Sequence, residues 1–278
     1  MIIKVSDIFK HMKKYPRVLT IAGSDSGGGA GIQADIKAIS ATGSYAASAI
    51  TAITVQNTVG VEAVHPVPVE ILSGQISAVI SDIGVDAVKI GMLHSPEVVR
   101  AVRDRLVEFG VKNIVLDPVM VATSGHRLIE DSAIEVLVSE LVPIARVITP
   151  NVPEAEILAG EKINSQADLP SIARKLSCGG KVSVLMKAGH LTEDELVDVF
   201  YNAEEDHCIE LKSKRLFTPN THGTGCTLSS AFASFLAQGY SLDDAARAAK
   251  DYITNAIASG AEYEIGHGHG PVNHFFKR

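Results

Sequence analysis

The chain has 278 residues, of which 46% are hydrophobic and 21% are charged, and its 25 Lys and Arg against 32 Asp and Glu leave a formal net charge of −7. The high apolar fraction argues against intrinsic disorder, and the acidic balance argues against a nucleic-acid binder, which needs a basic face for phosphates. No stretch reaches the roughly 18 apolar residues that a transmembrane helix needs.

The first residues, Met1 to Pro16, differ from the rest of the chain. They hold Asp7 and four lysines among isolated apolar residues and lack the apolar core of a signal peptide. We expect an N-terminal extension at 1–16 and a single domain at 17–278, because no linker interrupts the later pattern. The cysteines Cys178, Cys208 and Cys226 form no CxxC pair, which favours a reducing compartment such as the cytoplasm over a disulfide framework or a zinc site.

Short β-branched runs alternate with segments of helical periodicity along the chain. The predicted strands are Val18–Ala22, Ser48–Val55, Asp86–Ile90, Asn113–Leu116, Ala145–Ile148 and Val182–Met186, with an antiparallel edge pair at Val197–Phe200 and Cys208–Leu211. The predicted helices include Ile32–Ala41, Pro68–Ser81, Pro96–Phe109, Asp131–Leu141, Gln166–Leu176, Gly225–Gln238 and Leu242–Ala258. This alternation predicts a mostly parallel sheet with helices on both faces, and therefore an α/β fold.

Polar residues follow almost every predicted strand. In open parallel sheets, ligands bind beyond the carboxyl ends of the strands. The residues at these positions are Gly23, Ser24, Asp25, Gln56, Asn57, Gly91, Met92, Asp117, Asn151, Glu154 and Lys187. Each alone is explained as a polar strand end, but together they supply a carboxylate pair, an amide pair and a lysine on one rim, which indicates a binding site.

Two glycine-rich segments precede predicted helices. The segment Gly23–Gly31 contains no GxxxxGK[ST] phosphate loop, and its GxGxxA match begins only at Gly29, well after the predicted strand end at Ala22. The second strand also lacks a terminal acidic residue for a ribose, so a dinucleotide-dependent oxidoreductase is disfavoured. The segment Thr221–Cys226 (THGTGC) leads directly into a helix, where exposed N–H groups can bind a phosphate; a plain glycine turn is the equal alternative.

Several of these strings together resemble one family. The matching segments are Leu19–Asp35, Val55–Thr58, Lys89–Leu93, Leu116–Met120, Thr149–Ala155, Leu185–His190, Asn220–Thr227 and Gly268–Phe275. The chain from Val18 onward resembles the ribokinase-like kinases, which have a three-layer α/β/α fold with a mostly parallel central sheet. Within them it is most similar to the hydroxymethylpyrimidine/phosphomethylpyrimidine kinases of thiamine biosynthesis.

The resemblance implies ATP-dependent phosphorylation of 4-amino-5-hydroxymethyl-2-methylpyrimidine and then of its monophosphate. It assigns the pyrimidine to Gln56, Asp35, Gly23, Met92 and Val119. It assigns ATP to Lys187, Asn151 and Thr221, Mg²⁺ to Asp117 and Glu154, and the transferred phosphoryl group to Gly223, Thr224, Gly225 and Cys226. A glutamine amide can pair with an aminopyrimidine edge as it does with adenine, and Asp35 can accept a hydrogen bond from the amino group or the hydroxyl, unless it only favours a helix N-terminus.

Cys226 stands where most ribokinase-like kinases have an aspartate base. A helix N-terminus lowers the pKa of a cysteine, so we expect Cys226 to act as a thiolate base; the alternative is a neutral thiol that leaves catalysis to the metal and the loop. Two other functions stay open, a pyridoxine or pyridoxal kinase and a catalytically inactive pyrimidine- or nucleotide-binding regulator. The family also implies a homodimer, and we expect no nucleic-acid or membrane partner.

Overall fold

The computed structural model describes residues 14–121 and 128–277. The strands are β1 (Arg17–Asp25), β2 (Tyr45–Gln56), β3 (Val61–Pro66), β4 (Ala87–Ile90), β5 (Ile114–Leu116), β6 (Val147–Ile148), β7 (Ser183–Met186), β8 (Glu195–Asn202) and β9 (His207–Lys214). The α-helices are α2 (Gly31–Ala41), α3 (Val69–Asp82), α4 (Pro96–Glu108), α5 (Asp131–Val136), α6 (Val152–Ala159), α7 (Leu169–Leu176), α8 (Thr224–Ala237) and α9 (Leu242–Gly260).

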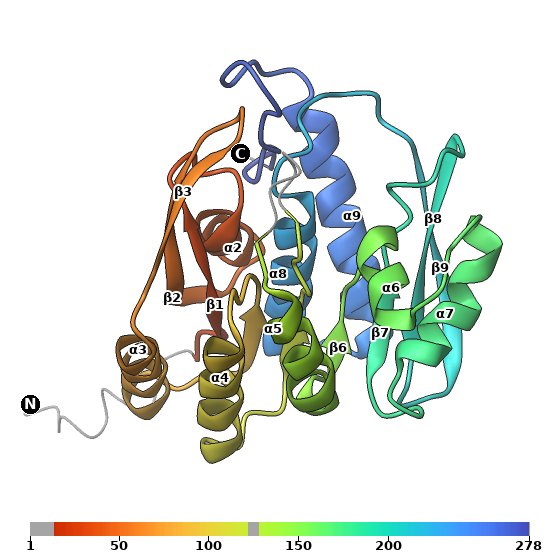
Figure 1. The fold of residues 1–278 in the computed structure, drawn as a ribbon. Coiled ribbons are helices and arrows are strands. Elements are labelled where there is room, and N and C mark those ends of the chain that lie inside the picture. Colours follow the sequence, from red (N-terminus) through yellow and green to blue (C-terminus); the bar gives the residue numbers. More distant parts are fainter. Residues whose placement is uncertain (1–13, 122–127, 278) are drawn as a thin grey trace, which may run out of the picture.

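These strands form one sheet in the order β3-β2-β1-β4-β5-β6-β7-β8-β9 (Figure 1). Neighbouring strands from β2 to β7 run parallel, whereas β3, β8 and β9 are added to the two edges as antiparallel strands. The predicted mostly parallel sheet and the predicted antiparallel edge pair are therefore confirmed.

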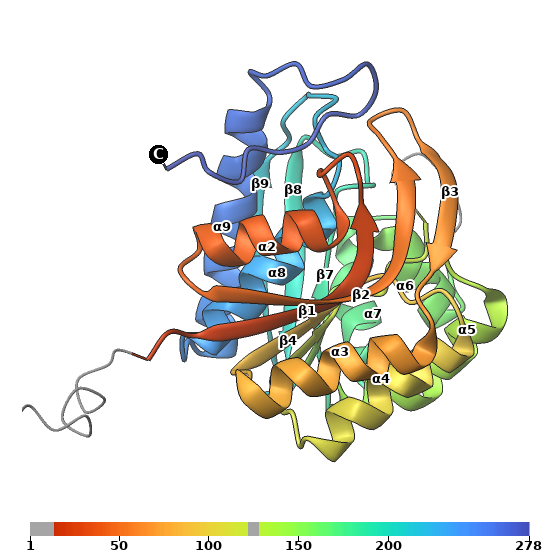
Figure 2. The ribbon, with the colours of Figure 1, turned by 90° about the vertical axis from the view of Figure 1, so that its left-hand side faces the viewer.

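Helices cover both faces of the sheet, so the fold has three layers (Figure 2). One hydrophobic core packs α3, α4, α5, α6 and α7 against the sheet, and a second core packs α2, α8 and α9 against the opposite face. Strands between two helical layers are buried on both faces, and β4, β5 and β7 are buried along their whole length, Lys89 of β4 included. The expected α/β/α architecture is confirmed.

Some boundaries differ from the prediction, and two elements were not predicted. Strand β1 continues past Ala22 to Asp25 across a bulge, which carries polar residues into the sheet. The helix predicted to end at Leu141 changes at Leu137 into a wider π-helical turn. Strand β3 is almost wholly exposed and therefore has no core-facing alternation, and α6 is only eight residues long.

The structure describes only residues 14–16 of the expected N-terminal extension. Most of the expected extension at 1–16 lies outside the described residues; within it, the ring of Tyr15 lies 6.2 Å from that of Tyr45, at the start of β2. Within 14–121 and 128–277, no helix combines the length and the apolar composition needed to cross a membrane.

Candidate active site

The carboxyl ends of the parallel strands open into a cavity of about 620 Å³. Its walls come from the segments that follow β1, β4, β5, β6 and β7, together with the first turn of α8 and one side of α9. The predicted residues that line it are Gly23, Gln56, Met92, Asp117, Val119, Asn151, Glu154, Lys187, Thr221, Gly223, Thr224, Gly225 and Cys226. Residues from distant parts of the chain meet here because parallel strands end on the same edge of the sheet.

Asp35, which the resemblance assigns to the pyrimidine, is the exception, because it does not line this cavity. Its side chain is fully buried in α2 and accepts two hydrogen bonds from Lys89 Nζ, at 2.8 and 2.9 Å. Thr20 Oγ1 and Ser230 Oγ also donate to it, at 2.5 and 2.7 Å. Burial alone would lower the pKa of Lys89, but Asp35 outweighs this effect and the pKa is raised. Asp35 is thus a structural counterion outside the cavity lining.

The first turn of α8 forms part of the cavity wall. Gly223 precedes this turn with φ +80°, and a Cβ atom there would lie 1.9 Å from the carbonyl oxygen of Gly29. Only glycine fits both requirements. A Cβ atom at Gly225 would lie 3.2 Å from Lys187 Nζ and 3.4 Å from an Asp117 carboxylate oxygen. The helix start, whose first N–H groups have no acceptor inside the helix, therefore faces an ion pair at close range.

That ion pair belongs to a group of one cation and two carboxylates. Lys187 Nζ lies 2.8 Å from Asp117 and 3.9 Å from Glu154. Thr149 Oγ1 donates to Asp117 at 3.0 Å, and Asn151 and Glu154 cap α6 through reciprocal hydrogen bonds of 2.9 and 2.8 Å. A single lysine cannot compensate two carboxylates fully.

The electrostatics of the two carboxylates differ. Burial raises the pKa of Glu154 to about 7, with Lys187 opposing and Asp117 adding to the rise. For Asp117, burial acts upward but Lys187 and Lys89 outweigh it, and the pKa is lowered. Among the described residues no group of three or more His, Cys, Asp or Glu forms a metal site. Two carboxylates still suit Mg²⁺, which retains several waters and needs few protein ligands.

Cys226 lies in the first turn of α8 and lines the cavity, but it is not the thiolate expected at a helix N-terminus. Burial raises the pKa of its thiol to about 11, against the lowering effect of Lys89. The prediction of a lowered pKa is wrong because desolvation, together with Asp35 and Asp117, outweighs the nearby lysine. The thiol is protonated at neutral pH.

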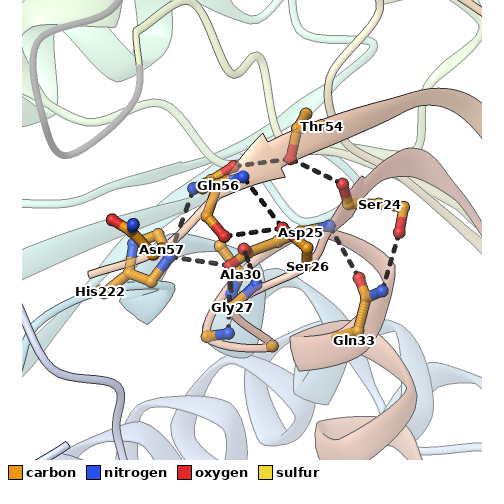
Figure 3. Close-up of polar contacts among 12 residues, drawn as sticks. Ser24, Asp25, Ser26, Gly27, Ala30, Gln33, Thr54, Gln56, Asn57 and His222 are labelled. Atoms are coloured by element: carbon orange, nitrogen blue, oxygen red, sulfur yellow. Dashed lines mark hydrogen bonds and ion pairs between the residues drawn. The ribbon is translucent and has the colours of Figure 1, made fainter. Parts of the chain in front are cut away.

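Another part of the cavity wall is built around Asp25 (Figure 3). One carboxylate oxygen accepts from the backbone N–H of Gly27 at 2.8 Å; the other accepts from Gly29 at 3.0 Å, Ala30 at 2.8 Å and His222 Nε2 at 2.9 Å. Burial would raise the pKa of Asp25, but these donors outweigh it and the pKa is lowered. Asp25 therefore fixes the glycine segment and ties it to the residue next to Gly223.

Gln56 lies beside this pair at the end of β2. Its amide is 3.1 Å from Thr54 Oγ1 and 3.4 Å from His222 Nε2. Met92 covers the same part of the cavity, and a Cβ atom at Gly23 would lie 2.6 Å from its terminal methyl carbon. Gly23 is thus required for Met92 to occupy this position.

Sequence reasoning placed Asp25 among the residues at the strand ends but assigned no individual role to Asp25, His222, Lys250 or Asp198. The signal for the first two was present, since Asp25 ends β1 and His222 lies within the THGTGC string. The second two form a buried pair on the cavity wall, with Lys250 Nζ 2.7 Å from Asp198, and nothing in their separate segments indicates the contact.

The C-terminal tail packs against Thr58, Asn220 and His222. The Gly270 carbonyl accepts from the backbone N–H of His222 at 3.0 Å, and the backbone N–H of His269 donates to Thr58 at 2.8 Å. Cβ atoms at Gly268 and Gly270 would lie 2.1 Å from Thr58 and Asn220 oxygen atoms, respectively. The glycines of the tail therefore permit its close approach to the site. His274, further along, contacts Thr227 of α8 at 3.0 Å.

Comparisons with known proteins point to one group of enzymes. Residues 25–273 match the family model described as phosphomethylpyrimidine kinase. The chain is 50% identical over 260 residues to the hydroxymethylpyrimidine/phosphomethylpyrimidine kinase of Rhizobium meliloti, covering 93% of this chain and 97% of that protein. It is 46% identical over 273 residues to the thiamine biosynthesis bifunctional protein of Geobacter sulfurreducens, covering 98% of this chain but only 55% of that longer relative.

Among solved structures, an ADP complex of Bacillus subtilis pyridoxal kinase is similar with a TM-score of 0.86 and 35% identity, covering 94% of this chain and 98% of that one.

Proposed function

The chain belongs to the phosphomethylpyrimidine kinase family, and we propose that it transfers the terminal phosphoryl group of ATP to 4-amino-5-hydroxymethyl-2-methylpyrimidine and then to the resulting monophosphate. The observation that carries this proposal is the arrangement of the cavity. Its wall brings together the start of α8, the Asp117–Lys187 pair and the amide of Gln56.

The pyrimidine is placed beside Gln56. The amide offers a donor and an acceptor to the ring nitrogen and the amino group, and Met92 supplies a polarizable surface for the ring. Gly23 and Val119 complete this part of the wall. The hydroxymethyl group then points towards the first turn of α8.

ATP is placed with its terminal phosphate at the start of α8. Lys187 offsets phosphate charge, Asn151 and Thr221 line the same region, and Gly223, Thr224 and Gly225 present backbone N–H groups to the transferred group. Asp117 and Glu154 would hold Mg²⁺, directly or through water. The ion would supply charge neutralisation on the phosphates, and the incompletely compensated Glu154 is consistent with a cation at this place.

Cys226 is assigned the role of a neutral thiol. Its buried position raises its pKa, so it does not supply a thiolate at neutral pH. Phosphoryl transfer depends mainly on positioning and electrostatic stabilisation, and a strong base is not required.

The central test follows phosphate transfer from labelled ATP to the free pyrimidine and to its monophosphate, with the purified full chain and Mg²⁺. We expect turnover of both acceptors, and removal of Mg²⁺ with a chelator should abolish it. The Gln56→Leu variant should raise the KM for the pyrimidine more than the KM for ATP. Equal effects on both constants would contradict the placement of the ring, and absence of turnover of both pyrimidines would refute the proposed function.

A pyridoxal kinase activity is the second candidate, because a pyridoxal kinase superposes on nearly the whole chain. A pyridine that carries a hydroxymethyl group fits the same part of the cavity. Comparing kcat/KM for pyridoxal and for the aminopyrimidine distinguishes the two, and the paired donor and acceptor of Gln56 favour the aminopyrimidine.

A homodimer and a cytoplasmic location complete the proposal. The ribbon of β2 and β3 exposes Ile53, Val55 and Val59 at 52%, 54% and 67%, which suits contact with a second copy. The thiols of Cys178, Cys208 and Cys226 are free, as is typical of a reducing compartment. Light scattering should give the mass of a dimer for the wild type and that of a monomer for Val55→Asp. A monomeric wild type would refute the dimer.

A further inference from the structure

We propose that the His222–Asp25 pair sets the direction of the Gln56 amide and thereby makes the site select a 4-aminopyrimidine over the corresponding 4-oxopyrimidine. This inference rests on the proposed function and extends it to two positioning residues. Its basis is the chain of contacts from Asp25 through His222 and Gln56 to Thr54 (Figure 3).

The first step fixes the hydrogen on His222. Asp25 accepts N–H groups from Gly27, Gly29 and Ala30, so its oxygens act as acceptors. His222 Nε2 lies 2.9 Å from the same carboxylate, and both residues are buried. A short contact with a buried carboxylate requires a hydrogen on Nε2. His222 Nε2 therefore carries a hydrogen, which it donates to Asp25.

The second step fixes the amide. Gln56 Nε2 is 3.4 Å from His222 Nε2, and two N–H donors cannot bond to each other. When the amide turns over, its oxygen faces His222 and accepts the same hydrogen as the longer branch of a three-centre bond shared with Asp25. The same turn brings the amide nitrogen to Thr54 Oγ1, which gives its own hydrogen to the Ser24 carbonyl at 2.8 Å and can accept. Both neighbours of the Gln56 amide therefore demand the same orientation.

The third step concerns the ligand. His222 directly precedes Gly223, so the oxygen of Gln56 lies on the side of the phosphate-binding turn. In the proposed substrate the amino group is next to the hydroxymethyl group, which faces the same turn. The amide oxygen then accepts from the amino group, and the amide nitrogen donates to the ring nitrogen. A 4-oxo ring presents an oxygen and an N–H in these places, so each contact would join two acceptors or two donors.

The test measures kcat/KM for 4-amino- and 4-oxo-5-hydroxymethyl-2-methylpyrimidine with the full chain. His222→Phe removes the N–H, and we expect it to lower the preference for the 4-amino ring by about tenfold, the equivalent of one hydrogen bond of roughly 1.4 kcal/mol. His222→Gln keeps an N–H that Asp25 can hold, and should retain a preference within about threefold of the wild type. Gln33→Leu is the matched control, because Gln33 bonds to Ser24 and to the Asp25 backbone without touching Gln56.

Equal losses on both rings in His222→Phe, with an unchanged preference, would overturn the inference. A Gln33→Leu variant that loses the preference to the same degree would also overturn it, since general loosening of the loop would then suffice. A ¹⁵N NMR spectrum of the imidazole groups in the wild type gives a second readout that needs no variant. We expect a protonated Nε2 on His222, and an unprotonated Nε2 would refute the inference. Failure of the wild type to phosphorylate the 4-amino ring would instead refute the proposed function.

Discussion

Two lysine–aspartate ion pairs lie near the carboxyl ends of the strands. The Lys187–Asp117 pair lines the cavity, whereas the Lys89–Asp35 pair is buried outside its lining. Lys89 lies 2.8 Å from Asp35, and Lys187 lies 2.8 Å from Asp117. The Lys89 side chain is 0% exposed and the Lys187 side chain is 14% exposed. The two ion pairs are therefore equal in length and differ in access to the cavity.

Their surroundings explain the difference. Asp35 accepts hydrogen bonds from Lys89, Thr20 and Ser230, so the charge of this pair is fully compensated inside the protein. Lys187 is shared between Asp117 and Glu154 and faces the start of α8. A short ion pair alone does not mark a catalytic group. Incomplete compensation beside a cavity does, because a phosphate and a cation can complete it.

Substitution of Lys187 breaks the Lys187–Asp117 pair, which lines the cavity. We expect Lys187→Met to lower kcat/KM by about 10³-fold, as loss of a phosphate-stabilising group does in other phosphoryl transfers. The free energy of unfolding should also fall, because Asp117 stays buried after it loses its partner at 2.8 Å, so the kinetic loss is the diagnostic effect. Steady-state kinetics and urea unfolding measure the two effects, with Lys187→Arg as the charge-conserving control. A large loss of stability with nearly normal kinetics would reverse the assignment.

Substitution of Lys89 breaks the fully buried Lys89–Asp35 pair. Lys89→Met leaves Asp35 buried without its counterion, and we expect a loss of about 3–5 kcal/mol in the free energy of unfolding. The double variant Lys89→Met/Asp35→Leu should recover most of this loss, because no unpaired charge stays buried. Urea unfolding at constant pH checks both. A single variant as stable as the wild type would show that Asp35 is not a charged, buried partner.

The pH dependence of stability tests how far Glu154 is left uncompensated. Its pKa in the fold is about 7, above its ordinary value of 4.5, so its favourable contribution is complete below about pH 4.5 and is lost as the pH rises through 7. Between pH 5 and pH 8 we expect the wild type to lose on the order of 2 kcal/mol relative to Glu154→Gln. Chemical unfolding of both proteins at the two pH values measures this difference, and parallel profiles would contradict it.

Substitution of Cys226 should have the smallest effect on the rate. Its thiol lies near both lysines but carries no charge at neutral pH, so its loss leaves both ion pairs in place. We expect Cys226→Ala to slow single-turnover phosphorylation by less than about tenfold, whereas loss of a general base costs about 10²–10⁴-fold. Cys226→Ser controls for the volume of the side chain. A loss of the larger size, together with a wild-type rate that rises steadily with pH, would restore the thiolate base.

Much of the architecture could be predicted from local pattern. Apolar β-branched runs such as Val182–Met186 alternate with amphipathic segments, and this alternation alone indicates a parallel sheet between two helical layers. It also places the residues after each strand on one edge, which is why Gln56, Asp117 and Lys187 were expected together and do line one cavity. Strand β3 escaped prediction because an exposed edge strand has no buried face to impose alternation.

The ion-pair partners and the pKa values of the site residues could not be predicted from the sequence, because both depend on groups that are far apart in the chain. Asp35 and Lys89 are 54 residues apart, and Asp25 and His222 are 197 apart, so no local pattern links them. Cys226 illustrates the same point: its place at the head of a helix suggested a thiolate, yet the depth of its burial controls its protonation. Residue types and their order specify which groups reach the edge of the sheet. Desolvation and long-range partners, which exist only in the folded chain, specify which of those groups are charged and available for chemistry.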